Sequence, residues 1–170
     1  MDSSNTGSPR ALGKGRRVSI AAFCVLAALW LPAKAQDGAQ DAALDFIITH
    51  QVGSNLPQMA MAAASRTETF RMLGYQWGLP EARKQVEREI ARVAPTYQAR
   101  WDQNLAVAYA RHLSVQELSS LATEGAQSQY ISKFVSLQRA VGEDMRTSSE
   151  PMLTEMVAEV LVTVYARTEE

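Results

Sequence analysis

The sequence has almost no cysteine. Cys24 is the only one in 170 residues, and it lies in an apolar run near the N-terminus. Beyond that run the chain therefore has no disulfide, no thiolate ligand for a metal and no cysteine nucleophile. A chain of this size buries about 68% of its unfolded surface, so one domain can fold here without a metal or a disulfide.

Histidine and the common catalytic motifs are also scarce. His50 and His112 are the only histidines, and neither has a second ligand at His-x-x-x-His or Glu-x-x-His spacing. The sequence contains no Gly-x-Ser-x-Gly, no Ser-x-x-Lys and no glycine-rich phosphate loop. We therefore predict a non-enzymatic protein without a metal or a cofactor. A hydrolase that uses His112 with an unrecognised partner is kept as a further hypothesis.

Two other groups of residues form a catalytic or metal-binding site only if their side chains lie close together. The carboxylate pairs Glu87/Glu89 and Glu143/Asp144 occupy alternate or adjacent helical positions, which point apart, so we interpret them as solvated faces. Thioethers favour Cu(I), but residues two apart on a helix also point apart. We interpret five methionines as core residues: Met59, Met61, Met72, Met152 and Met156.

The segment from Arg16 to Ala35 reads as an export signal. Arg16 and Arg17 precede the apolar run Val18–Leu31, Pro32 breaks the run, and Ala33-Lys34-Ala35 places small residues at the cleavage positions. We predict a signal peptide over residues 1–35, cleaved between Ala35 and Gln36, and therefore a periplasmic or secreted protein.

Other readings of this segment are less favoured. An uncleaved anchor needs about 20 apolar residues, and this run is shorter. Lipidation of Cys24 requires small residues before the cysteine, where the chain has Phe23. The Arg16-Arg17 pair suggests the twin-arginine route, but Gly15 and Ser19 do not fit that signal, so we favour general secretion and no stable membrane insertion after cleavage.

Removing the signal makes the net charge more negative. The whole chain has 17 basic and 18 acidic residues, and residues 36–170 keep 12 basic and 17 acidic ones, a net charge of −5. A mildly acidic surface without a run of Lys and Arg argues against nucleic acid or anionic lipid as the main partner.

The chain after the signal has the periodicity of helices. Residues 36–40 are small and polar and are predicted to be a flexible N-terminus. Residues 41–170 show apolar positions at helical spacing, with no alternating strand pattern, and predict a single all-α domain, a compact bundle of about six or seven antiparallel helices. The breaks are expected at Gly53–Asn55, Gly74 or Gly78, Pro95, Ser114, Gly125 and Thr147–Pro151.

Three of these breaks have expected caps. Ser54 or Asn55 is expected to cap the second helix, and Ser148 or Ser149 the last one. Ser114 and Glu117 have the spacing of a capping box, in which the serine hydroxyl accepts the amide at N3 and the glutamate reaches back.

The segment from Tyr109 to Leu161 resembles a family of exported helical domains from Gram-negative bacteria, domain of unknown function 2059. The resemblance rests on Leu113-Ser114-Val115-Gln116-Glu117-Leu118, with Leu121 one turn later. The chain departs from the family at Glu124–Ser128, which replaces an aromatic pair and a Ser-Pro-x-Gly-like corner. The resemblance implies an all-α envelope protein and no particular activity.

Function is therefore a choice between classes. We predict an envelope protein that binds a protein partner through an exposed helix face, with a carrier of a small apolar ligand or lipid as the alternative. Trp77, Trp101 and Tyr109 could line a cleft for a ligand or a partner. His112, near a helix C-terminus, could join this surface, although a histidine there also serves as a cap.

The export signal makes the first testable prediction. N-terminal sequencing of the protein from the producing cells should return a chain that begins at Gln36. A mature chain that retains Val18–Leu31 would contradict cleavage and support an anchor.

Overall fold

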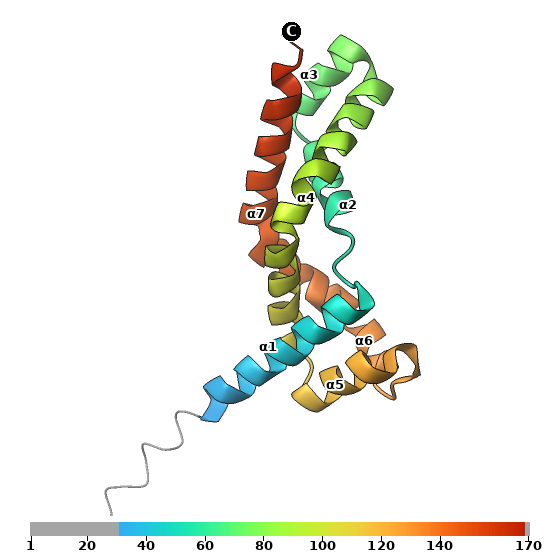
Figure 1. Cartoon of the computed structure of the whole chain (residues 1–170), viewed down its shortest axis with the longest axis vertical. Helices are drawn as coiled ribbons and strands as arrows, with labels where there is room; N and C mark the ends of the chain where they lie inside the picture. The colour runs from blue at the N-terminus through green and yellow to red at the C-terminus, as the bar shows by residue number, and fades with distance from the viewer. Residues whose placement is uncertain (1–30, 169–170) are drawn as a thin grey trace, which may run out of the picture. The chain divides into compact units, whose positions relative to one another are not determined.

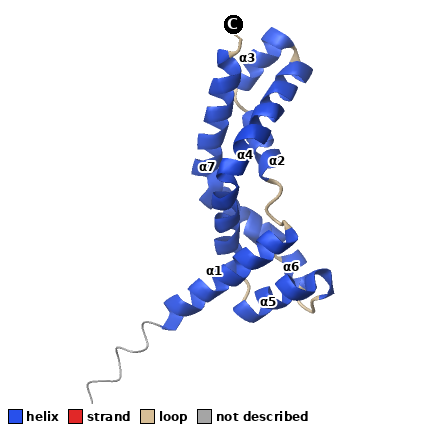
Figure 2. Ribbon diagram, in the orientation of Figure 1, coloured by secondary structure: helices blue, strands red, loops and turns tan. Residues whose placement is uncertain are grey.

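Helices make up nearly all of the part of the chain that the structure describes. The computed structural model describes residues 31–168, and in this range it has seven α-helices, one short 3-10 helix and no strand (Figure 1, Figure 2). The prediction of an all-α bundle is confirmed. Cys24 and the apolar run, apart from its last residue Leu31, lie outside the described residues. The elements are α1 (Leu31–His50), α2 (Leu56–Ala64), α3 (Glu68–Trp77), α4 (Leu79–Ala110), α5 (Val115–Glu124), η1 (Gly125–Gln127), α6 (Ile131–Ser136) and α7 (Gln138–Ala166).

The two longest helices, α4 and α7, lie side by side and antiparallel (Figure 1). Polar contacts fix the direction, because Tyr97 meets Glu159 whereas Arg111, farther along α4, meets the earlier Asp144 of α7. Both helices bury a continuous apolar stripe against this contact, and each stripe recurs every three or four residues. The stripes include Val86, Ile90, Val93, Trp101 and Leu105 of α4 and Met145, Met152, Met156, Val160 and Val164 of α7.

Helices α2 and α3 pack against both members of this pair. Pro57 stands in the first turn of α2, where its missing N–H costs no helical hydrogen bond. Leu56, Ala60, Phe70 and Leu73 are buried at the contact. These two helices and the α4–α7 pair together form the part of the bundle that contains the groove described below.

A second group of elements packs where α4 ends and α7 begins. The ring of Tyr109 in α4 stacks on Phe134 in α6 at 5.2 Å between centroids, and Phe46 in α1 meets Phe134 edge-on at 5.3 Å. His50 in α1 hydrogen-bonds through its Nε2 to the carbonyl oxygen of Ala122 in α5, at 2.9 Å. The aromatic contacts and this hydrogen bond join four helices that come from distant parts of the sequence.

The predicted breaks at the prolines are wrong. Pro95 lies inside α4 and Pro151 lies inside α7, so α4 joins two predicted helices and α7 runs through Thr147–Pro151. A proline removes one helical hydrogen bond and crowds the preceding turn, at a cost of about 3 kcal/mol. The buried stripes continue on both sides of each proline, and the packing of α4 against α7 keeps both helices continuous.

The expected serine cap near Pro151 is also wrong. Ser149 lies within α7 and is fully buried. Its hydroxyl oxygen accepts a hydrogen bond from Nδ2 of Asn104 in α4 at 3.1 Å, so it joins the two long helices instead of starting one.

The segment predicted as one helix from Met59 to Trp77 is two helices. Thr67 begins α3, because its Oγ1 accepts a hydrogen bond from the Phe70 amide at 3.2 Å. Asn55 stands at the N-cap of α2, but its side chain makes no capping hydrogen bond. The cap thus forms at a threonine that the sequence analysis did not single out.

Residues 36–40 are helical rather than a loose N-terminus. They belong to α1, where Ala39 is buried one turn before Ala43, so the apolar stripe of this helix starts earlier than predicted. The predicted cleavage site, Ala35–Gln36, lies within the same helix. The segment between Gly125 and Thr147, which was predicted to be one helix, is also divided: α6 ends at Ser136 and α7 begins at Gln138.

The predicted helix ends at glycine and the predicted capping box are both present. Gly78 follows α3 with φ 84° and Gly125 follows α5 with φ 54°, left-handed conformations that glycine adopts without strain. The Ser114 amide donates to Oε2 of Glu117 at 2.8 Å, and the Glu117 amide donates to Oγ of Ser114 at 3.3 Å. Hydrogen bonds from Lys133 and Ser114 outweigh desolvation and lower the pKa of Glu117.

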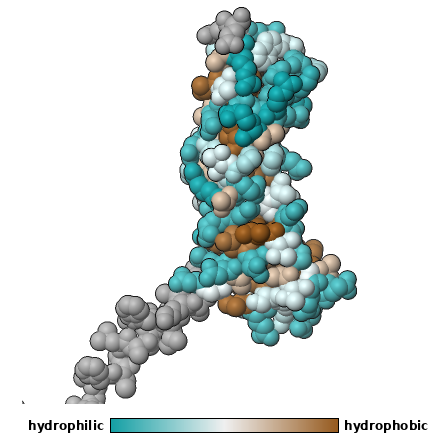
Figure 3. Space-filling view, viewed as in Figure 1, coloured by the Kyte–Doolittle hydropathy of each residue, from teal (hydrophilic) through white to brown (hydrophobic). Residues whose placement is uncertain are grey.

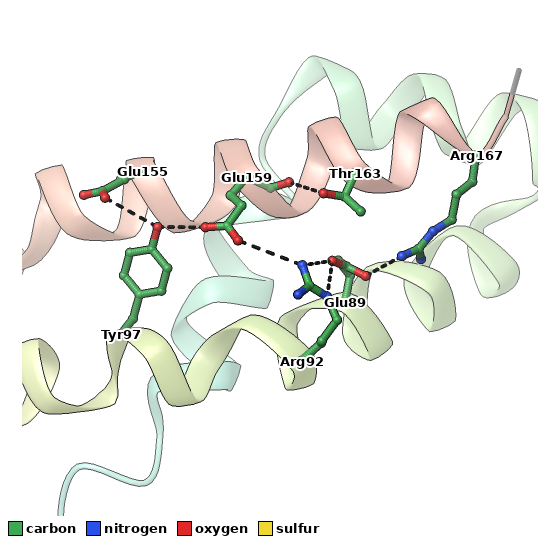
Figure 4. A network of polar contacts seen from close by, with 7 residues as sticks. All are labelled: Glu89, Arg92, Tyr97, Glu155, Glu159, Thr163 and Arg167. Atoms are coloured by element: carbon green, nitrogen blue, oxygen red, sulfur yellow. Dashed lines mark hydrogen bonds and ion pairs between the residues drawn. The ribbon is translucent and has the colours of Figure 1, made fainter.

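A buried carboxylate joins the ends of α4 and α7 (Figure 4). Glu89 is only 2% exposed, in contrast to the solvated face predicted for it, and it accepts hydrogen bonds from Arg92 at 2.7 Å and from Arg167 at 2.6 Å. Burial opposes ionisation of Glu89, but the two guanidinium groups outweigh it and lower the pKa of this carboxyl.

Farther along the same contact, Tyr97 faces two glutamates of α7 (Figure 4). Its hydroxyl donates to Glu159 at 3.0 Å and lies 3.5 Å from Glu155. Burial and the hydrogen bond to Glu159 raise the pKa of Tyr97 to about 12, so the hydroxyl remains a donor at any physiological pH.

The capping box makes a prediction about stability. Ser114→Ala should lower the free energy of unfolding by about 1 kcal/mol, because the Glu117 amide loses its acceptor. Denaturant unfolding measures the loss. Ser119→Ala, an exposed site in the interior of the same helix, is the control and should change stability by less than about 0.5 kcal/mol. Equal midpoints for both variants would contradict a stabilising cap.

Glu89 makes a prediction about pH. Because its pKa in the folded protein lies below the ordinary 4.5, its contribution is complete above that pH and is lost as the pH falls through the folded pKa. Glu89→Gln should therefore cost about 1.5–3 kcal/mol near pH 7, and the difference from wild type should shrink in acid.

Urea unfolding at several pH values measures this difference. Glu87→Gln is the matched control, because Glu87 is exposed and makes only an i,i+4 pair with Arg83. A Glu89→Gln penalty that stays constant between neutral pH and pH 3 would contradict an ionised Glu89.

Candidate binding groove

An elongated groove of about 1390 Å³ runs between α2–α3 and α7, with α4 as its floor. Its lining comes from α2, the turn after α2, the first half of α3, the last third of α4 and almost the whole length of α7. On the one face of the molecule shown in Figure 3, apolar surface lies in patches among polar residues. We call the space between α2–α3 and α7 the α7 groove.

The floor of the α7 groove is aromatic and aliphatic. Trp101, Leu105 and Tyr109 succeed one another at four-residue spacing on α4 and are all buried. Oη of Tyr109 accepts a hydrogen bond from Nε2 of Gln138 at 3.1 Å, and burial raises the pKa of this tyrosine. The indole nitrogen of Trp101 is buried and has no acceptor among residues 31–168.

The walls of the groove are apolar and open to solvent. Met59 of α2 and Met72 of α3 are 42% and 43% exposed on one side, and Val162 and Tyr165 of α7 are 70% and 39% exposed on the other. The prediction that Met59 and Met72 fill the core is wrong, because both side chains are exposed. Met61, Met152 and Met156 are buried as predicted. The groove is therefore an unfilled apolar channel at the surface.

Gly142 leaves part of the α7 wall without a side chain. It lies in the middle of a helical turn that borders the groove, and a Cβ added there would meet no atom within 4 Å. The first half of the α7 wall therefore has room for a bulky group from an occupant.

Three charged residues border the groove. Arg146 pairs with Glu143 at 2.6 Å, and Glu150 lies close enough to raise the pKa of Arg146 further. Arg66, in the turn between α2 and α3, is exposed and makes no ion pair within the described range.

The structure separates the residues predicted to form one surface. Trp101 and Tyr109 both line the groove, whereas Trp77 and His112 do not. Trp77 is partly buried at the end of α3. The sequence analysis missed Gly142 and Arg66, because neither belongs to an apolar stripe or a known motif.

His112 joins α4 to α7 rather than capping its own helix. Its Nε2 lies 3.0 Å from Oδ2 of Asp144, and Arg111 donates to the other oxygen of Asp144 at 2.9 Å. The hydrogen bond with His112 is the main reason that the pKa of Asp144 is lowered. Asp144 is therefore engaged rather than solvated as predicted. A His–Asp pair can orient an imidazole for proton transfer, but within residues 31–168 His112 has no hydrogen bond to a hydroxyl nucleophile.

Metal-binding clusters and membrane-spanning helices are both absent from the described part of the chain. No three His, Cys, Asp or Glu side chains between residues 31 and 168 lie close enough together to hold a metal ion. No helix in the same range has both the length and the apolar character needed to cross a membrane.

Comparison with known proteins gives no relative. No family model, no curated protein and no solved structure matches this chain. The resemblance of residues 109–161 to the exported helical family stays a prediction.

Proposed function

We propose that this chain is an exported, non-enzymatic binding protein whose α7 groove receives the apolar face of a helix from a partner protein in the cell envelope. The observation that carries the proposal is an open apolar channel between α2–α3 and α7, with a buried aromatic floor and exposed Met and Val side chains on its walls.

The size of the groove favours an elongated occupant. Its α7 wall extends from Gln138 to Ala166, which is about 42 Å at a rise of 1.5 Å per residue. Pockets for small molecules usually measure about 300–1,000 Å³ and enclose most of the ligand. A groove of about 1390 Å³ that is open along its side matches a helix laid lengthwise better than a compact ligand.

The chemistry of the walls supports the same occupant. Methionine side chains are flexible and polarisable, so Met59 and Met72 can adapt to the side chains of a partner. The space over Gly142 can take one large apolar residue, the kind of anchor that contributes most of the binding energy in many interfaces. The export signal, which is inferred from the sequence, supports a partner in the envelope.

The test places a photo-crosslinking residue in the groove of the full-length protein in its producing cells. Val162 is the groove position, and Tyr75, which is 81% exposed and outside the groove, is the control. The groove position should give a discrete protein adduct, attached at an amphipathic segment of the partner, and the control should not. Gly142→Trp, which fills the open space, should reduce the adduct at least about tenfold, whereas Gly142→Ala should leave most of it.

Three results would overturn the proposal. Equal adducts at Val162 and Tyr75, or no protein adduct at either, would show that the groove is not a protein site. An adduct at Val162 with the mass of a lipid alone would favour the carrier. Circular dichroism of Gly142→Trp checks that the fold is intact, as the space around Gly142 predicts.

A further inference from the structure

The charged residues of the α7 groove indicate which charge its occupant carries. This inference rests on the function proposed above. Arg66 borders the groove, and its guanidinium makes no ion pair among the described residues. A guanidinium only donates hydrogen bonds and cannot accept one. An occupant that complements this part of the groove therefore supplies acceptors.

The other charges of the groove lie on or beside the α7 wall. Arg146 pairs with Glu143 at 2.6 Å, and Glu150 also acts on its charge. This cluster has two acidic residues and one basic residue, whereas Arg66 is the charged residue that lines the opposite wall. Because Arg66 is in the turn between α2 and α3, its side chain borders the groove where one wall passes from α2 to α3.

We propose that the helix bound in the α7 groove carries carboxylates on the flank that faces the α2–α3 turn, where they pair with Arg66. The apolar face of this helix lies on Trp101, Leu105 and Val162, and its acidic flank sets its orientation in the groove. Charge at the rim of an interface mainly sets register and partner choice, while the apolar contacts supply most of the affinity.

The probes are two synthetic amphipathic peptides of about 18 residues, or about 27 Å as helices. Both carry leucine at helical spacing and differ only in one flank, which is glutamate in one and lysine in the other. Binding of each labelled peptide to the intact protein is followed by fluorescence polarisation at low and high salt.

The acidic-flank peptide should bind about fivefold more tightly than the basic one to the wild-type protein, a ratio typical of an exposed ion pair, and high salt should reduce the ratio. Arg66→Glu should reverse the preference. Arg139→Glu is the matched control, because Arg139 is exposed, lies outside the groove and undergoes the same change of charge. It should leave the ratio near the wild-type value.

The failures of the two proposals are distinguishable. If both peptides bind, both are blocked by Gly142→Trp, and Arg66→Glu leaves their ratio unchanged, the acidic-flank proposal is wrong and the groove proposal stands. If neither peptide binds, both proposals are overturned. If oleate displaces both peptides and binds more tightly than either, with loss of affinity in Arg66→Glu, the carboxylate belongs to a lipid and the helix proposal is overturned.

Discussion

The antiparallel packing of α4 against α7 is the contact on which the rest of the structure depends. Each helix contributes an apolar stripe that continues over most of its length, and the burial of both stripes keeps the helices unbroken through Pro95 and Pro151. Ser149 and Asn104 add a partly buried hydrogen bond between the two helices, and Glu89 with Arg167 adds a charged one near the end of α7. Helices α2 and α3 pack against both members of this long pair.

The groove follows from the unequal lengths of these elements. α7 has 29 residues, whereas α2 and α3 have 9 and 10 and are separated by the turn at Thr67. Two short helices cannot cover the full length of a helix three times as long, so side chains of α7 such as Val162 and Tyr165 stay exposed. The break at Thr67 also places Arg66 in a turn, where its charged side chain reaches the groove instead of continuing along a helix.

Polar contacts between distant segments decide which residues are available to a partner. His112 and Asp144 are occupied with each other and with Arg111, so they tie α4 to α7 and do not present a free imidazole to the groove. Glu89 is likewise held by two arginines. Arg66, which borders the groove, makes no ion pair in the described range, and its positive charge is the basis for the acidic flank proposed for the occupant.

The sequence alone determined the all-α class, a helix end at Gly74 or Gly78, another at Gly125, and the Ser114–Glu117 box. These depend on interactions within a few residues or on a helical repeat of apolar side chains, and both can be read along the chain. Only the tertiary structure decided that two prolines stay within helices, that Glu89 is buried and that Met59 and Met72 face a groove. Each of those outcomes depends on contacts between segments that are distant in the sequence. Arg167, just beyond α7, pairs with Glu89, the packing of α4 against α7 keeps both helices continuous, and α2 and α3 pack with Met59 and Met72 on the side that borders the groove.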